Sequence, residues 1–166
     1  MRGKNQPPAE PSHHALGRSR GGFGTKLHLL TDGHGLPLTV LVSPGEAHES
    51  KWAVPLLESC DASLPSGRRR PLAVAGDRGY SVDHLRFWLR KRHIRPVIPT
   101  RSNQRRQRDF SPKRYRRRNV VERAVGLLKE ARRVATRYEK LAIHYLGVLK
   151  LAMLQVTMRA AFSNTP

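Results

Sequence analysis

The stretch PLAVAGDRGYSVDHLRFWLRKRHIRPVIPT, residues 71 to 100, decides the fold class of this chain. It opens with a continuous apolar run, Leu72 to Ala75, which is typical of a strand buried on both faces in a parallel or mixed sheet. Ser81 can then cap a helix whose apolar surface is carried by Val82, Leu85, Phe87, Trp88 and Leu89. Residues 94 to 100, IRPVIPT, predict a short strand near an edge, because a sheet interior tolerates proline poorly. The order of strand, helix and strand predicts a βαβ unit, and therefore an α/β fold.

Upstream of this unit, residues 23 to 44, FGTKLHLLTDGHGLPLTVLVSP, form two β-rich runs around the turn sequence DGHG. Such a pattern predicts a β-hairpin in which Asp32 serves the turn. The preceding GRSRGG, residues 17 to 22, cannot build a core and predicts a loop. We expect residues 1 to 16 to be a disordered polar lead and residues 17 to 166 to form one folded domain.

Helical spacing of apolar residues recurs in three further segments. Residues 49 to 60 predict a helix, and a basic loop containing Pro65 and Gly67 follows it. After a polar basic loop, residues 101 to 112, we expect one long helix over 113 to 137 and a final apolar helix over 139 to 162. The stripe predicted to be buried on the long helix consists of Val120, Ala124, Leu127, Ala131 and Val134.

The charge of the chain predicts a polyanionic partner. Lys and Arg number 32 against 12 Asp and Glu, so the net charge is +20. Residues 101 to 140 hold 15 of these cations against 4 acids, which places +11 of the charge in one segment. Nucleic acid is the leading partner, and this segment is expected to be the center of the binding face.

The sequence disfavors a membrane or secreted protein and a fold held by disulfides or by cysteine-bound zinc. No apolar run approaches the roughly 20 residues of a membrane-spanning helix, and the first residues lack a signal-peptide core, so we expect a cytoplasmic protein with no membrane partner. Cys60 is the single cysteine, which excludes an internal disulfide and a cysteine-based zinc site.

Asp77 is the first candidate for chemistry. It follows the predicted strand at its carboxyl end, where open α/β sheets gather their functional groups. It could equally be a loop carboxylate that pairs with Arg78 or caps the turn.

Glu122 is the second candidate. Tyr115, Arg118, Glu122 and Lys129 are separated by 3, 4 and 7 residues, which lines them along one helix face. In one interpretation Glu122 only makes surface pairs with Arg118 and neighboring arginines, worth ~0.2 to 0.5 kcal/mol each. In the other, a carboxylate beside phosphate-binding cations shares divalent metal with a second carboxylate. Spacing alone leaves the two interpretations open.

These four residues reproduce the Y-(2)-R-(3)-E-(6)-K signature, and the chain resembles insertion-sequence transposases of the DDE type. GRSRGGFGTKLHLLTDGHGLPL, AGDRGYSVDHLR, IRPVIPTRSN and YRRRNVVER, in this order, are similar to the insertion-sequence-five group of that family. The resemblance runs from about Leu16 to Arg159. It implies an RNase H-like mixed sheet flanked by helices, in which three acids bind two Mg²⁺ ions and cut and rejoin DNA strands.

Residue roles follow from the same resemblance. Asp77 matches the second acid and Glu122 the third, which makes both of them catalytic and metal-binding. Arg118 and Lys129 match signature positions that contact DNA. Arg116 and Tyr115 are expected at the same DNA-binding face.

The first acid of the family has no counterpart, because the residues before Leu16 contain neither an Asp nor a strand pattern. We therefore expect a missing central strand, and a chain that is inactive alone and is joined to an upstream-frame polypeptide or is a truncated remnant. Robust activity of the chain alone would instead require an internal replacement, with Asp32 or Glu46 as the nearest candidates. Two alternatives are a catalytically dead DNA-binding regulator and a basic RNA-binding protein. Copies of the chain could also associate.

Several further acids, histidines and tryptophans give weaker signals of function. GEAHES, residues 45 to 50, gathers Glu46, His48 and Glu49, a spacing that can ligate metal but is more common in caps and surface groups. His13 and His14 are assigned to the disordered lead, and Trp52 and Trp88 to core packing rather than base stacking.

Overall fold

The computed structural model describes residues 14–19, 21–60, 70–105 and 107–163, and within them the chain forms two separate β-sheets with helices around them. The predicted polar lead through residue 13, including His13, lies outside the described residues, as does most of the basic loop that follows Cys60. His14 and the buried Ala15 are described, and the backbone carbonyl of His14 accepts a hydrogen bond from Arg137.

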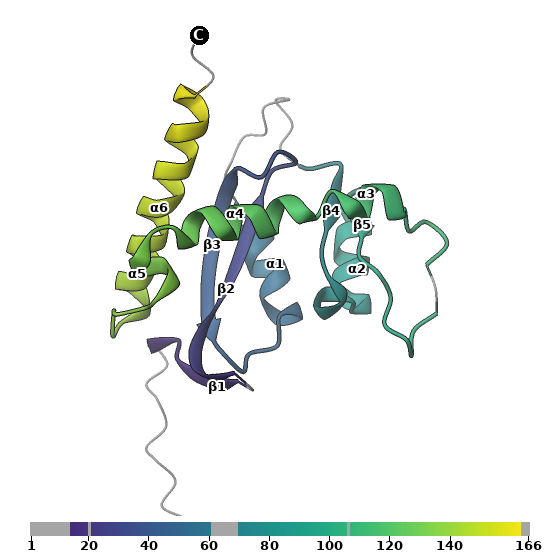
Figure 1. Cartoon of the computed structure of the whole chain (residues 1–166). Helices are drawn as coiled ribbons and strands as arrows, with labels where there is room; N and C mark the ends of the chain where they lie inside the picture. The colour runs from purple at the N-terminus through teal and green to yellow at the C-terminus, as the bar shows by residue number, and fades with distance from the viewer. Residues whose placement is uncertain (1–13, 20, 61–69, 106, 164–166) are drawn as a thin grey trace, which may run out of the picture.

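The first sheet is antiparallel and has the order β1-β2-β3, with β1 at Gly17–Ser19, β2 at Gly22–Thr31 and β3 at Pro37–Pro44 (Figure 1). The predicted hairpin is confirmed, and Oδ1 of Asp32 accepts hydrogen bonds from the amides of His34, Gly35 and Leu36 at 2.8 to 2.9 Å. Gly35 has a positive φ of 98°, which favors glycine, and an added Cβ atom would also lie only 3.3 Å from the carbonyl oxygen of Val120. The prediction that GRSRGG is a loop was wrong over its first half, because Gly17–Ser19 form β1 and pair with Gly22–Gly24. This pairing uses backbone groups, which polar side chains do not block.

The second sheet is the predicted βαβ unit. Strands β4, Ala73–Ala75, and β5, Arg95–Val97, are parallel and are joined through helix α2, Asp83–Lys91. The strand before Asp77 is not buried on both faces: Ala75 is exposed, because β5 is its only partner strand among the described residues.

The predicted Ser81 cap was also wrong. Helix α2 has Val82 at its N-cap position, and the Ser81 hydroxyl instead accepts a hydrogen bond from the buried guanidinium of Arg86 at 2.9 Å. Phe87 was predicted to belong to the apolar surface of this helix, but it is 68% exposed.

The long helix predicted over 113 to 137 is broken into three: α3, Pro112–Arg116, α4, Asn119–Lys129, and α5, Arg132–Ala135. Arg117 and Arg118 keep right-handed helical backbone angles between α3 and α4, whereas Ala131 is extended at ψ 109° and ends the run. Helices α1, Ser50–Glu58, and α6, Ala142–Phe162, match their predictions within a few residues. No helix in the described part of the chain has the length and apolar character needed to cross a membrane.

Two apolar clusters hold the molecule together. The first joins β2 and β3 to α4, α5 and α6, and the second joins α1 to the βαβ unit. The predicted α4 stripe needs one correction, because Leu128 is fully buried while Leu127 is 45% exposed. Trp52 stacks on buried His28 and Trp88 packs against the second cluster, as predicted. Helix α6 uses only one face, and its other face exposes Ile143, Leu151, Leu154, Met158 and Phe162.

The arrangement brings α4 across the sheet. In Figure 1 this helix passes in front of β2 and β3 and points toward β4 and β5. The α3–α4 junction therefore lies beside the end of β4, where Asp77 follows the strand.

Candidate active site

Asp77 begins the turn that follows β4. Its backbone is extended, and its Oδ1 accepts the amide hydrogen of Gly79 at 2.8 Å, which caps a short 3-10 turn over Arg78–Tyr80. The turn-capping interpretation of this carboxylate is thus observed. A single amide uses only part of the acceptor capacity of a carboxylate, so Asp77 retains oxygens that can bind a ligand.

A pocket of about 340 Å³ opens at this turn. Its lining consists of Asp77, Arg78, Gly79, Pro99 and Tyr115. The guanidinium of Arg101 donates to the carbonyls of Arg78 at 3.1 Å and Gly79 at 3.2 Å, which ties the basic loop after β5 to the same turn. The pocket therefore combines the carboxylate of Asp77 with the cation Arg78, and Arg101 is bound to the backbone of the same turn.

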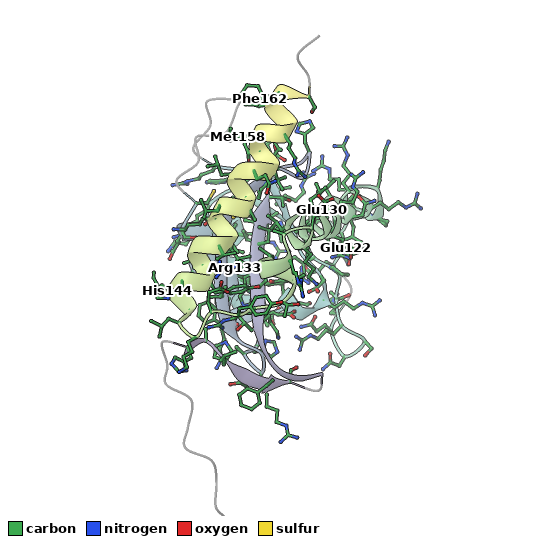
Figure 2. The ribbon with its side chains drawn as sticks, turned by 60° about the vertical axis from the view of Figure 1, so that its left-hand side comes forward. Glu122, Glu130, Arg133, His144, Met158 and Phe162 are labelled. Carbon is green, nitrogen blue, oxygen red and sulfur yellow. The ribbon has the colours of Figure 1, made fainter. Side chains whose placement is uncertain are left out.

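Tyr115 connects the pocket to Glu122. The guanidinium of Arg118 lies 5.6 Å from the center of the Tyr115 ring, and its Nη2 donates to Oε1 of Glu122 at 2.6 Å. Glu122 lies on α4 with 61% of its side chain exposed (Figure 2). The surface pair that the sequence allowed is therefore present, and it stands next to the pocket.

The pKa of Arg118 links both acids electrostatically. Partial burial lowers the pKa, but the hydrogen bond to Glu122 and the charges of Tyr115, Glu122 and Asp77 outweigh burial and raise it above its ordinary value. Arg118 thus carries a permanent positive charge within the field of both predicted catalytic acids.

The other two predicted DNA-binding residues lie on the outside. Arg116 ends α3 and Lys129 ends α4, and both side chains are exposed. Lys129 is two helical turns beyond Glu122 on the same face, about 10 Å along the axis. These cations extend the positive surface away from the pocket.

The sequence patterns gave Glu49 little weight as a site residue, but the structure brings it close to Asp77. It is the residue before α1, and its Oε2 would lie 2.0 Å from a Cβ atom on Gly79, while Oδ1 of Asp77 would lie 2.9 Å from the same atom. The two carboxylate oxygens are therefore no farther apart than the sum of these distances. Glu46 instead lies over Gly17 of β1, and His48 contacts the Ser50 hydroxyl at 2.8 Å.

The donor set suits Mg²⁺. This ion prefers oxygen ligands and is usually held by one or two carboxylates, with water and substrate phosphates completing the shell. The described residues contain no group of three or more His, Cys, Asp or Glu side chains with metal-binding geometry. They do bring two carboxylates together at Gly79, where an added Cβ atom would displace the Glu49 carboxylate. The residues present therefore fit a weakly held divalent cation.

Fold and pocket together define the class: a strongly basic α/β domain with acids and cations gathered at the carboxyl end of a parallel strand pair. The family described as Transposase DDE domain matches residues 3–156, and the chain belongs to this family.

Two relatives agree with this assignment. A protein described as a transposase for insertion sequence element IS402 of Burkholderia cepacia is 33% identical over 135 residues, which cover 77% of this chain and 60% of that protein. A second, described for element IS6501 of Brucella ovis, is 32% identical over 139 residues, which cover 81% of this chain and 98% of that protein. The chain thus matches less than two thirds of the first relative and nearly all of the second. No solved structure matches the chain.

Proposed function

We propose that this chain cuts and transfers DNA strands at the ends of an insertion sequence, as a DDE transposase of the insertion-sequence-five group. Asp77 and Glu122 are its catalytic, metal-binding acids, and Tyr115, Arg116, Arg118 and Lys129 bind the DNA. The observation that supports this most is the link between the two acids: Asp77 and Tyr115 line one pocket, and Arg118, whose guanidinium lies 5.6 Å from the Tyr115 ring, bonds Glu122.

When bound, two Mg²⁺ ions would activate the attacking water or 3′-hydroxyl and stabilize the leaving oxygen. The side chains of the chain prepare this chemistry. Arg118 can exchange the Glu122 carboxylate for a DNA phosphate, because guanidinium binds either anion through the same fork of N–H groups. Glu122 then becomes fully available as a metal ligand once a DNA phosphate has replaced it at Arg118.

We further propose that an upstream-frame polypeptide supplies the first acid on a strand between β2 and β4. The support is a pair of open edges: within the described residues β1 covers β2 only over Gly22–Gly24, and β4 is paired only by β5. A strand between them would join both sheets into one RNase H-like sheet and satisfy their backbone groups. The chain alone is then expected to bind DNA without strand transfer.

A second candidate function is a DNA-binding regulator without catalysis. It is favored by the fact that both acids already have protein partners, Asp77 the amide of Gly79 and Glu122 the guanidinium of Arg118. This candidate predicts DNA binding with no metal-dependent cleavage under any condition.

The test is Mg²⁺-dependent cleavage of the element's own ends by the chain alone and by the chain fused to the upstream frame. We expect activity only in the fusion, and a loss of at least about a hundredfold in Asp77→Ala and Glu122→Ala. Asp83→Ala, an exposed acid on α2, is the matched control and should remain active. If the fusion keeps its activity after Asp77→Ala or Glu122→Ala, the assignment of that residue as catalytic is wrong. If the chain alone is active, the proposal that its first acid comes from an upstream polypeptide is wrong.

A further inference from the structure

Glu49 and Asp77 approach each other from different elements. Glu49 precedes α1 and Asp77 follows β4, and one carboxylate oxygen of each lies within 3 Å of the position that a Cβ atom on Gly79 would occupy. Any larger residue at position 79 would collide with Glu49, since Oε2 would be 2.0 Å from the added carbon. The absence of a side chain at Gly79 is what allows the two acids to meet.

Two like charges at this separation repel unless a cation accompanies them. The structure places a cation beside one oxygen of Glu49: Nζ of Lys26 lies 3.5 Å from Oε1 of Glu49 and donates to the carbonyl of Ala47 at 2.8 Å. The other carboxylate oxygen, Oε2, faces Asp77. The Glu49 side chain thus has one oxygen held by protein and one directed at the pocket turn.

We propose that Glu49 is a metal ligand of the active site, which binds a divalent cation together with Asp77 across Gly79, and that Lys26 positions its carboxylate when no ion is bound. The inference rests on the proposed function, which assigns the metal site to Asp77 and Glu122. Glu49 would be a further metal ligand within this chain. The chain alone is therefore expected to bind divalent cations, even though strand transfer would require the upstream polypeptide.

Binding of Mn²⁺ to the full chain, followed by the relaxation enhancement of water protons, tests the proposal without any activity. Glu49→Gln and Asp77→Asn should each weaken Mn²⁺ binding by about tenfold or more, because each removes a charged ligand. Glu46→Gln is the matched control: its carboxylate lies over Gly17, and its Mn²⁺ affinity should equal that of the wild type.

Two further variants separate a ligand from a structural residue. Gly79→Ala changes no charge but displaces the Glu49 carboxylate, so it should also weaken Mn²⁺ binding. Lys26→Met removes the competing cation and should tighten Mn²⁺ binding several-fold. A Glu49 that only paired with Lys26 would give no change in either variant.

The outcomes distinguish this inference from the function beneath it. If Asp77→Asn weakens Mn²⁺ binding while Glu49→Gln, Gly79→Ala and Lys26→Met leave it unchanged, Glu49 is not a ligand and the proposed function stands. If Asp77→Asn and Glu49→Gln both leave Mn²⁺ affinity at the wild-type value, the inference and the proposed metal site both fail.

Discussion

Single charged side chains decide what the pocket can bind, and Arg118 is the residue where two roles meet. It bonds Glu122 at 2.6 Å and lies within the field of Asp77. As long as this bond persists, Glu122 is only partly available to a metal ion. If Arg118 binds DNA as proposed, it would couple DNA binding to the acidic site, because exposed pairs of this kind contribute only ~0.3 to 0.5 kcal/mol and can exchange.

Replacing Arg118 by Gln should separate the two roles. DNA binding should weaken and lose about one unit of its salt slope, because one phosphate contact disappears. Mn²⁺ binding should tighten by about twofold, because Glu122 is released from a pair of that strength. Arg116→Gln, the neighboring control, should weaken DNA binding alone, and equal effects of both variants on Mn²⁺ would contradict the coupling.

His28 is a second decisive residue, and it acts on stability. It is buried on β2, stacks on Trp52 at 5.4 Å and shares a 2.8 Å hydrogen bond between Nε2 and the Ser43 hydroxyl. Its Nδ1 has no hydrogen-bond partner in the part of the chain that the structure describes. Burial, and to a lesser degree the charge of Lys26, lower its pKa from 6.5 to about 4.

This shift predicts a loss of stability in mild acid. Between pH 6.5 and about 4 the unfolded chain binds a proton on His28 that the folded chain rejects, so the free energy of unfolding falls as pH decreases through this window. The His28 contribution is up to ~3 kcal/mol and is fully present above pH 6.5. Urea unfolding at several pH values should show a flatter pH dependence for His28→Gln than for the wild type, whereas exposed His144→Gln should match the wild type.

At the scale of elements, local patterns predicted what local forces decide. The turn residues around Asp32 and the apolar runs that flank Asp77 determined the hairpin and the βαβ unit, and both are present. The end of α4 could not be predicted, because Ala131 is a strong helix former and is extended only through its packing in the first core cluster. Within α4 the core face follows the step of four residues from buried Ala124 to buried Leu128, so Leu127 lies outside the core.

The corrected stripe predicts different costs for two adjacent residues. Leu128→Ala should lower the free energy of unfolding by ~2 to 5 kcal/mol, because the side chain is fully buried between the sheet and α6. Leu127→Ala, with 45% of the residue exposed, should cost less than about 1 kcal/mol. Chemical denaturation of both variants measures the difference, and equal costs would contradict the burial of Leu128 and the exposure of Leu127.

At the scale of the whole molecule, contacts between distant segments escaped the sequence. Asp77 and the signature residues could be proposed as candidates from the sequence because their types and spacing are those that such chemistry needs. The meeting of Glu49 with Asp77 could not, because it depends on how α1 packs against the βαβ unit and on the space left by Gly79. The division into two sheets likewise depends on which strands pair with each other, and no local sequence pattern specifies that pairing.

The charge distribution predicts how the whole molecule meets DNA. With +11 of the +20 charge in residues 101 to 140, binding should show little sequence preference and fall steeply as salt rises. Reversing Arg116 and Arg118 to Glu should weaken binding to all sequences alike. Fluorescence anisotropy over a salt series measures both effects, and an affinity that is independent of salt would contradict the electrostatic account.

The central claim, that Asp77 and Glu122 serve one metal site, is tested most directly by the NMR signals of the ¹⁵N-labeled chain in the presence of Mn²⁺. We predict that substoichiometric Mn²⁺ broadens the amides of residues 77–79 and 119–123 together, since one paramagnetic ion would lie near both segments. Glu122→Gln should then reduce the broadening at 77–79, and Asp77→Asn should reduce it at 119–123. Broadening of one segment that is unaffected by substitution of the acid in the other would contradict the shared site.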